Sequence, residues 1–228
     1  MTNNSRWNNS MSGGDRVRPV QRKSAQARRV EVLGETLKQI REHGMSTMRI
    51  ADVAAAMHVS PALIIYHFET KENLLVEALM HAAERDLLKL RRVMREVDSP
   101  ADRVMAALDW YAPTGQARGW QIWVDGWSAA MRDKTFSKVL ADLQDQWTEE
   151  IARAIDDGVS EGAFRVDNSH DAATRITSLL DGLAVRMVVH KEKFKRDVLR
   201  GWLIRQVAWE LDIDQQDLMS SGGEEQTS

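Results

Sequence analysis

The sequence of 228 residues contains no cysteine and only four prolines. The absence of cysteine excludes disulfide bonds, thiol nucleophiles and thiolate metal sites, and it agrees with a reducing compartment. No stretch approaches the roughly 18 consecutive apolar residues of a membrane span, and the N-terminal sequence MTNNSRWNNSMSGG is polar where a secretory signal is apolar. We therefore expect a cytoplasmic protein with no membrane partner.

The common catalytic motifs are also missing. The sequence has no P-loop, GxGxxG, HExxH or GxSxG motif, and its six histidines are scattered along the chain. These absences predict a protein that is not an enzyme and that carries no metal and no cofactor.

Helical periodicity dominates what is present. The prolines stand at positions 19, 61, 100 and 113, and the long intervals between them carry apolar residues three and four positions apart. The hydrophobic content of 43% is ample for a buried core. The pattern predicts an all-α fold, with mobile polar tails at residues 1–20 and 214–228.

The charge is unevenly distributed. Residues 1–71 contain 11 Lys and Arg against 6 Asp and Glu, a balance of +5, whereas residues 72–228 contain 20 against 28, a balance of −8. This asymmetry fits a nucleic-acid-binding head on an acidic body, and solvated helix faces are the alternative explanation.

Four helices are expected in the first hundred residues. The first runs from Gln21 to His43 and ends at Gly44, with Val30, Leu33, Leu37 and Ile40 on one face. A short second helix has a buried stripe of Ile50, Val53, Ala54 and Met57, and Thr47 or its neighbour caps its start. A third begins at Pro61 after the cap Ser60, and a fourth runs from Lys71 to about Val97. Two short helices joined by a three-residue turn have the dimensions of a helix-turn-helix.

The third helix has two different edges. Ile64 and Phe68 form an apolar edge that can seat it on the neighbouring helices. Pro61, Ala62, Ile65 and Tyr66 occupy the opposite edge, where they could meet base edges and phosphates in a DNA major groove. The alternative is that Ile65 and Tyr66 pack against another helix of the same chain.

The segment RIADVAAAMHVSPALIIYHFETKENLLVEAL resembles the DNA-binding domain of the TetR family of bacterial transcriptional regulators. The resemblance implies a small core of Val53, Ala54, Val59, Ile64, Phe68, Leu74 and Leu75. It also implies DNA contacts from Ser60, Pro61, Ala62, Ile65, Tyr66, His67 and Lys71, and we add Arg28, Thr47 and Arg49 as candidates. His58 departs from the family pattern because it replaces a turn glycine, although histidine tolerates a positive φ better than a branched residue does. Arg49 replaces a Thr or Ser at the start of the second helix, where a positive charge opposes the helix dipole. A nearby DNA phosphate would offset this unfavourable interaction, and a solvated arginine is the alternative.

Residues 16–29 form a basic segment ahead of the first helix, with Arg16, Arg18, Arg22, Lys23, Arg28 and Arg29 among Pro, Gln and Ser. Such an arm could enter a minor groove, and simple solubility is the alternative.

Seven of the eight tryptophans lie after Pro100. In GWQIWVDGWSAAMRD, Trp120, Trp123 and Trp127 share one helix face, which is the usual pattern of core packing. The alternative is an aromatic pocket that binds an organic cation by cation–π attraction beside a carboxylate. WQIWVDGWSAAMRD and LLDGLAVRMVV resemble the C-terminal domain of the TetR branch that includes a choline-responsive member. The candidate ligand residues are Trp110, Tyr111, Trp120, Trp123, Asp125, Trp127, Trp147 and Asp181, and Asp109 is a further carboxylate nearby.

The last two expected helices, from about His170 to His190 and from Lys195 to Leu211, carry wide apolar stripes. The family resemblance implies that they form a four-helix bundle across a two-fold dimer interface, with Gly182 allowing a close approach. The candidate interface residues are Leu179, Leu183, Met187, Trp202 and Trp209.

The predicted organisation is therefore a helix-turn-helix domain at residues 21–70, a connecting helix at 71–97, and a larger helical ligand-binding and dimerisation domain at 98–213. The resemblance implies a homodimeric repressor that leaves a palindromic DNA operator when a small-molecule effector binds. The alternative is a helical ligand-binding or protein-interaction module without specific DNA binding.

Overall fold

The computed structural model describes residues 24–114 and 118–219, and every regular element within these ranges is helical. The helices are α1 (Ala25–His43), α2 (Ile50–Ala56), α3 (Pro61–Phe68), α4 (Lys71–Arg95), α5 (Pro100–Tyr111), the 3₁₀ turn η1 (Arg118–Trp120), α6 (Gln121–Ala130), α7 (Lys134–Ser160), α8 (Ser169–Val188), α9 (Arg196–Leu211) and α10 (Gln215–Met219). The predicted all-α class is confirmed. The expected N-terminal tail at residues 1–20 lies outside the described residues.

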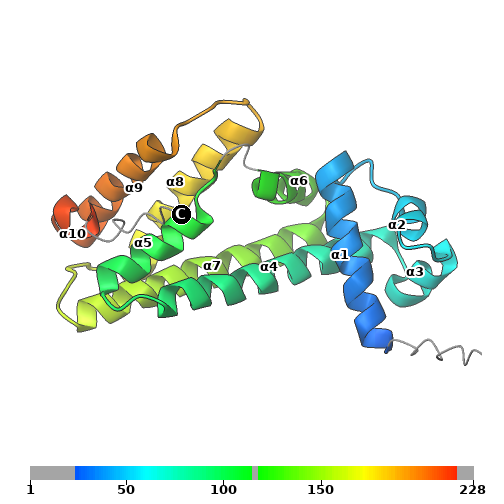
Figure 1. Cartoon of the computed structure of the whole chain (residues 1–228), viewed down its shortest axis with the longest axis horizontal. Coiled ribbons are helices and arrows are strands. Elements are labelled where there is room, and N and C mark those ends of the chain that lie inside the picture. Colours follow the sequence, from blue (N-terminus) through cyan, green and yellow to red (C-terminus); the bar gives the residue numbers. More distant parts are fainter. Residues whose placement is uncertain (1–23, 115–117, 220–228) are drawn as a thin grey trace, which may run out of the picture.

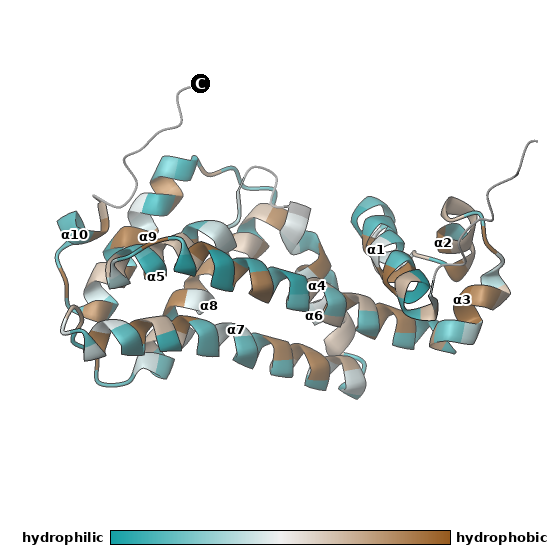
Figure 2. Cartoon of the chain, turned by 60° about the horizontal axis from the view of Figure 1, so that its bottom comes forward, coloured by the Kyte–Doolittle hydropathy of each residue, from teal (hydrophilic) through white to brown (hydrophobic). Residues whose placement is uncertain are grey.

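The helices form a head and an elongated body (Figure 1). Helices α1, α2 and α3 make the head at one end, while α4 and α7 lie side by side along the body. Helices α5, α8, α9 and α10 complete the body at the other end, and α6 lies between α1 and α8. In Figure 2 the hydrophobic residues of α4 and α7 alternate with hydrophilic ones along each helix, as expected for helices with one buried face. Within the described residues no single helix has the length and apolarity of a membrane span, and α2 with α3 reach them only as a pair bent by 117°.

Side-chain caps explain where most of the helices begin. The Ser24 hydroxyl accepts a hydrogen bond from the Ala27 N–H, so α1 begins at Ala25. Two Ser-Pro pairs act alike: the Ser60 and Ser99 hydroxyls cap α3 and α5, and each proline takes the first helical position, where an N–H is not needed. The break expected at Pro100 is therefore the start of α5.

The head core is shared with α4. The predicted core residues Val53, Ala54, Ile64, Phe68, Leu74 and Leu75 are buried, and Val59 is half-buried against them. The first half of α4 joins this head cluster through Leu74, Leu75, Ala78, Leu79 and Ala83, whereas Leu87 and Leu90 join the body cluster. Leu33, Leu37 and Ile40 of the expected apolar face are buried, whereas Val30 near the start of α1 is 42% exposed.

The body core places a close contact where α7 ends. A Cβ atom added at Gly158 would lie 2.2 Å from two carbons of the Phe164 ring, because the chain after α7 folds back and lays this ring on the helix. Only glycine fits here without movement.

The expectation of a mobile tail from residue 214 is wrong for 215–219, because α10 forms there and its Leu218 is fully buried against the body core. Short polar segments of this kind give no strong periodic signal.

Charged pairs join the body helices. Glu150 of α7 is 6% exposed and accepts hydrogen bonds from Arg91 of α4 at 2.6 Å and from Arg153 at 2.9 Å. The bond from Arg91 is the main reason why the pKa of Glu150 is lowered. Glu210 of α9 accepts from Arg175 of α8 at 2.6 Å. These pairs tie α4 to α7 and α8 to α9.

Candidate DNA-binding face and effector site

The turn between α2 and α3 is a helix-turn-helix turn with histidine in the place of glycine. His58 has a φ of 54°, which confirms that it can take the left-handed conformation the turn requires. The His58 N–H donates to the Ala55 carbonyl at 3.1 Å, and the Val59 N–H donates to the Ala54 carbonyl at 3.0 Å. The end of α2 is thereby satisfied and the chain is directed into α3.

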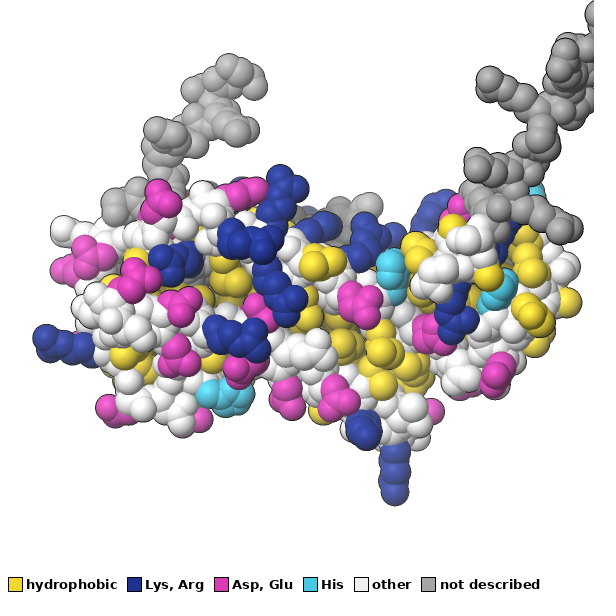
Figure 3. Space-filling view, turned by 90° about the horizontal axis from the view of Figure 1, so that it is seen from below, with side chains coloured by type: hydrophobic (Ala, Val, Ile, Leu, Met, Phe, Trp, Pro, Cys, Tyr) yellow, Lys and Arg dark blue, Asp and Glu magenta, His cyan; other side chains and the backbone are white. Residues whose placement is uncertain are grey.

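Helix α3 is seated by one edge and exposed on the other. Ile64 is 0% and Phe68 is 2% exposed, whereas Ile65 is 48% and Tyr66 is 81% exposed. Pro61 and Ala62 are also exposed. Figure 3 shows hydrophobic side chains reaching the surface at the outer end of the head, on the right. The alternative in which Ile65 and Tyr66 pack against the chain's own interior is therefore wrong.

Arg29 of α1 holds α3 and α4 together, which the sequence did not reveal. Its guanidinium donates to the backbone carbonyl of His67 and to the carboxylate of Glu77, and its Cζ lies 4.4 Å from the centre of the Phe68 ring. Placing Arg29 in a flexible basic arm is therefore wrong, since it lies within α1 and fixes the orientation of α3. His67 is half-buried, with its ring edge-on to that of Tyr66 at 5.3 Å.

The other DNA-binding candidates surround α3. Thr47 is exposed, but its hydroxyl donates to the carbonyls of His43 and Gly44, so the prediction that it caps α2 is wrong. Arg49 is exposed and occupies the N-cap position without a side-chain cap bond. The Lys71 Nζ donates to the Ser46 carbonyl at 3.1 Å. Arg28 lies in α1, 3.6 Å from Glu31, while Arg16, Arg18, Arg22 and Lys23 of the expected arm fall outside the described residues.

Five aromatic rings meet inside the body. The Tyr111 ring centre lies 4.7 Å from that of Trp120 and 4.6 Å from that of Trp147, and Trp120 lies 6.4 Å from Trp127. Tyr111, Trp123, Trp127 and Trp147 line a cavity of about 20 Å³, which has room for roughly one water molecule. We call these rings, with Trp120, the aromatic cluster. The fold therefore brings together candidate ligand residues from three helices, namely the end of α5, α6 and α7.

A carboxyl group adjoins the aromatic cluster. The Tyr111 hydroxyl donates to Asp181 Oδ1 at 2.9 Å. Burial raises the pKa of Asp181 to about 6, and the hydrogen bond from Tyr111 opposes that rise only in part. Burial, together with the charge of Asp181, raises the pKa of Tyr111 well above its usual value. The phenol therefore stays protonated near neutral pH, while the carboxyl group titrates close to it.

A wider groove opens beside the cluster. It measures about 660 Å³ between α6, α7 and α8 and is lined by Trp127, Gln144, Asp181, Asp145 and His170, among others. Trp127, Leu140 and Gln144 line both the groove and the small cavity. Sequence reasoning missed Leu140, Leu143 and Gln144 as cavity residues, although Gln144 precedes Trp147 by three positions and so shares its helix face.

Three expected members of the ligand site lie elsewhere. Trp110 stacks on the outside of Trp147, with ring centres 5.7 Å apart, and it does not line the cavity. Asp109 accepts a hydrogen bond from Arg200 Nε at 3.1 Å. Asp125 lies on the far side of α6 from the rings, where its Oδ2 accepts from the Met45 N–H of the α1–α2 connection at 3.0 Å. The prediction that Asp125 contacts a ligand is wrong, because its carboxylate instead joins the body to the head.

The predicted dimer residues divide into two groups. Leu183 and Met187 are 6% and 4% exposed within the single chain, where they pack against Trp120 and Leu199, so they belong to its core. Leu179 and Trp202 are half-buried, and Trp209 is 75% exposed. Leu179, Trp202 and Trp209 therefore remain open to a partner.

Two family models match this architecture. Residues 32–78 match the model described as "Bacterial regulatory proteins, tetR family", and residues 100–212 match the model described as "BetI-type transcriptional repressor, C-terminal". The first covers most of the head and the second covers α5 to α9. The chain belongs to the TetR family of transcriptional regulators. Members of this family bind DNA operators and small-molecule effectors and form dimers, and the family is not a class of enzymes.

Known proteins of the family are similar along most of their length. The HTH-type transcriptional regulator BetI of Ectopseudomonas mendocina is 26% identical over 182 residues, which cover 76% of this chain and 88% of that one. A transcriptional regulator from Saccharomonospora viridis, solved in complex with choline, superimposes with a TM-score of 0.73 at 25% identity, covering 82% of this chain and 98% of that one. A TetR-family regulator from Rhodococcus sp. superimposes with a TM-score of 0.69 at 25% identity, covering 82% and 99%. This TetR-family chain is a ligand-responsive, DNA-binding regulator of the repressor type.

Proposed function

We propose that this TetR-family regulator is a homodimeric repressor that an organic cation of the choline type releases from a palindromic operator. The observation that carries the proposal is the pairing of two features in one chain. The outer edge of α3 is free for DNA, with Tyr66 81% exposed, and a closed cluster of five aromatic rings adjoins Asp181 in the body.

On the DNA side, α3 enters the major groove with its first turns toward the bases. Ser60, Pro61, Ala62, Ile65, Tyr66 and His67 contribute from α3 and its cap, and Arg28, Thr47, Arg49 and Lys71 contribute from its surroundings. Arg49 is exposed and Lys71 is half-buried at the start of α4, and both cations suit phosphate contacts. Because a regulator of this family acts on DNA, we place the protein in the cytoplasm.

On the effector side, the aromatic faces and the half-buried carboxyl group of Asp181 suit a quaternary ammonium ion. Cation–π attraction is strongest over tryptophan, and Trp123, Trp127 and Trp147 all line the cavity. The choline complex of the Saccharomonospora viridis regulator supports this effector class. A cavity of about 20 Å³ is too small for such a ligand, since ligand pockets measure roughly 300–1,000 Å³. We therefore infer that the effector moves the rings apart as it enters from the adjoining groove, which Trp127 and Asp181 line.

Helix α6 can carry that movement to the head. Trp123 and Trp127 face the cavity. Asp125 follows Trp123 by two residues, about 200° around the helix, and its carboxylate accepts a hydrogen bond from the Met45 N–H. Gly44, with a φ of 85°, ends α1 beside Asp125. A Cβ atom added at Gly44 would lie 3.7 Å from Asp125 Oδ2. A shift of α6 thus reaches the point where α1 turns toward α2. The effector acts as an inducer if it binds the shifted state better than the DNA-bound state.

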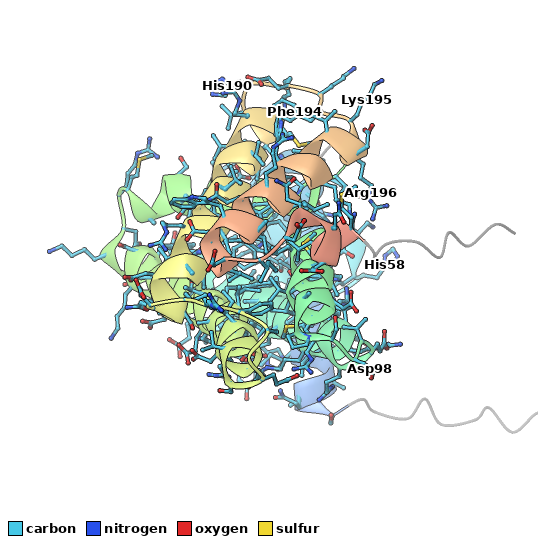
Figure 4. All side chains as sticks on the ribbon, turned by 90° about the vertical axis from the view of Figure 1, so that its left-hand side faces the viewer. His58, Asp98, His190, Phe194, Lys195 and Arg196 are labelled. Carbon is cyan, nitrogen blue, oxygen red and sulfur yellow. The ribbon has the colours of Figure 1, made fainter. Side chains whose placement is uncertain are left out.

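For the dimer, we propose the exposed face of α8 and α9. Cβ atoms added at Gly182 and Gly201 would meet nothing within 4 Å, which leaves room for a partner helix. An open hollow of about 500 Å³ between α8 and α9 is lined by Leu179, Gly182, Phe194 and Trp202, among others. Figure 4 shows Phe194 with His190, Lys195 and Arg196 where α8 leads into α9. A two-fold axis through this face would pair α8 and α9 into a four-helix bundle.

The test uses the full-length protein and a DNA fragment selected from random sequence. We expect a specific gel shift that choline reverses, and no reversal by 3,3-dimethyl-1-butanol, which has the shape of choline without its charge. Trp123→Leu should abolish the response to choline but leave DNA binding intact, and Trp110→Leu is the matched control because Trp110 lies outside the cavity. Equal reversal by both compounds would reject a cationic effector, and no specific shift under any condition would favour a module without DNA recognition.

A further inference from the structure

The outer edge of α3 is almost free of hydrogen-bonding side chains. Residues 61–68 read PALIIYHF, and the exposed members of this set are Pro61, Ala62, Ile65 and Tyr66. Ile64 and Phe68 are buried, and Leu63 and His67 are half-buried. The Ser60 hydroxyl ahead of the helix accepts a hydrogen bond from the Leu63 N–H at 3.3 Å. Tyr66, in the second turn, is therefore the one exposed residue of the helix itself with a polar side-chain group.

Such a surface cannot read most base edges. Guanine is read by Arg or Lys, adenine by Asn or Gln, and cytosine by Asp or Glu, all through hydrogen bonds in the major groove. Residues 61–68 contain none of these six residue types. The remaining sequence-specific feature of the groove is the C5-methyl group of thymine, which aliphatic side chains recognise by contact.

The orientation of α3 is fixed, so another face cannot replace this one. Arg29 binds the carbonyl of His67 and the carboxylate of Glu77, and it covers the ring of Phe68. Rotation of the helix would break these contacts and expose Ile64. Ala62 and Ile65, three positions apart in the first two turns, consequently project from the same side. The N-terminal turns of a recognition helix are the part that meets base edges.

The cations of the head lie around α3 and not on it. Arg49 is at the start of α2, and Lys71 opens α4, where its ammonium group donates to the Ser46 carbonyl. These positions flank the helix, where phosphates run past a groove-bound helix. Phosphate contacts fix the position of the protein on DNA but carry no sequence information, which leaves specificity to the aliphatic face.

We infer that Ala62 and Ile65 read thymine methyl groups, so that each operator half-site places thymines beneath the first two turns of α3. This inference rests on the proposed DNA contact of α3 and adds the class of base that it recognises. It also assigns Ile65, with the larger side chain, as the main residue determining specificity.

Uracil substitution tests the inference directly. Operators are first selected from random DNA, and each thymine of a half-site is then replaced by deoxyuridine, which removes one methyl group and keeps the base pair. We expect about a fourfold loss of affinity for each contacted methyl, and about fifteenfold when both half-sites are changed, measured by fluorescence anisotropy at fixed salt concentration.

Two variants identify the side chain. Ile65→Ala should reduce the penalty for uracil at one thymine to less than twofold, and its thermal unfolding should match that of the parent because Ile65 is half exposed. Tyr66→Phe is the control, since it should weaken binding to thymine and uracil duplexes by the same factor. Equal affinity for both duplexes, with a loss on replacing guanine by 7-deazaguanine, would overturn the inference and indicate readout by Arg49. Failure to select any sequence would instead contradict the proposed DNA binding itself.

Discussion

Replacing Asp181 with Asn removes a carboxyl group whose pKa burial has raised to about 6, from a usual value of 3.8. Asn keeps an oxygen that can accept the hydrogen bond from the Tyr111 hydroxyl, so the change removes the charge more than the contact. Two measurable quantities should respond, namely the stability of the fold and the affinity for a cationic effector.

The stability effect follows from the difference between the two pKa values. The difference of about two units corresponds to about 3 kcal/mol, at 1.36 kcal/mol per unit. Because the pKa is higher in the folded state, the folded protein binds more protons than the unfolded chain between about pH 4 and pH 6. This contribution to stability is fully present below pH 4 and is lost as the pH rises through 6. At pH 7.5 we expect Asp181→Asn to be more stable than the parent by up to about 3 kcal/mol, with no difference near pH 4.

The binding effect has the opposite sense. A cation held by the aromatic cluster favours the carboxylate form of Asp181, so choline should bind more tightly as the pH rises from 5 to 7.5. The change should approach tenfold per pH unit below pH 6 if the cation requires the charged form. Asp181→Asn should bind choline weakly and with little dependence on pH.

Urea denaturation and calorimetric titration with choline, each at pH 5, 6 and 7.5, measure both effects. His170 and Asp145 line the same groove as Asp181, so His170→Gln is the control for the other side chains of the groove. The reasoning would be refuted if Asp181→Asn kept the parental pH dependence of choline binding, or if His170→Gln removed it.

Four further changes test other parts of the structure. Asp125→Ala should bind choline up to about tenfold more tightly, because opening the cavity no longer breaks the bond to Met45, and choline should release DNA less effectively, as measured by DNA affinity with and without choline. Gly158→Ala should lower the free energy of unfolding by about 1–3 kcal/mol in urea, because its Cβ would overlap the Phe164 ring. His58→Gly should raise it by up to about 1 kcal/mol by relieving a φ of 54°. Arg29→Lys should cost about 1–3 kcal/mol and weaken DNA binding, since lysine cannot bind the His67 carbonyl and the Glu77 carboxylate at once.

Each of these outcomes can fail in a specific way. Parental stability and DNA binding in Arg29→Lys would show that Arg29 does not fix the orientation of α3. Parental release of DNA by Asp125→Ala would remove α6 from the coupling route. A Gly158→Ala protein of parental stability would show that Phe164 can move aside at no cost. A destabilised His58→Gly variant would mean that the imidazole contributes contacts outweighing its backbone strain.

The head could be predicted from sequence because its signals are local. Ser60-Pro61, Thr70 and the i, i+4 pair of Ile64 and Phe68 specify the ends and the buried edge of α3 within a few residues. The outward face then follows from geometry. Arg29 could not be assigned in this way, because its partners lie 38 and 48 positions away and only the folded chain brings them together.

The candidate effector site was predicted only in part, for a related reason. Large aromatic residues can be chosen as pocket candidates by residue type alone. Four of the candidates line one cavity, namely Tyr111, Trp123, Trp127 and Trp147. The residue type of a carboxylate does not indicate where it lies in the fold. Asp125 was grouped with the rings because it is near them in the sequence, but it faces the head. Asp181, 70 positions after Tyr111, is the carboxylate that contacts the cluster. Leu183 and Met187 were predicted to lie in a dimer interface, but they pack within the single chain. An apolar stripe on a helix shows that the face is buried, and not whether it packs against the same chain or a second copy.

The hydrogen bond from Met45 to Asp125 limits how strongly the effector can act on DNA binding by this route. A hydrogen bond to a charged group contributes about 1.5–3 kcal/mol to stability, and Asp125 is half-buried, so the lower part of that range applies. If opening of the aromatic cavity breaks the bond, each subunit can transfer at most that free energy to the head, which corresponds to roughly tenfold in operator affinity. A dimer has two such bonds, so their combined loss gives about a hundredfold, within the usual range of allosteric coupling. Effector release stronger than this would require the shared core of the head, in which Ile122 of α6 packs with Leu79 of α4, to rearrange as well.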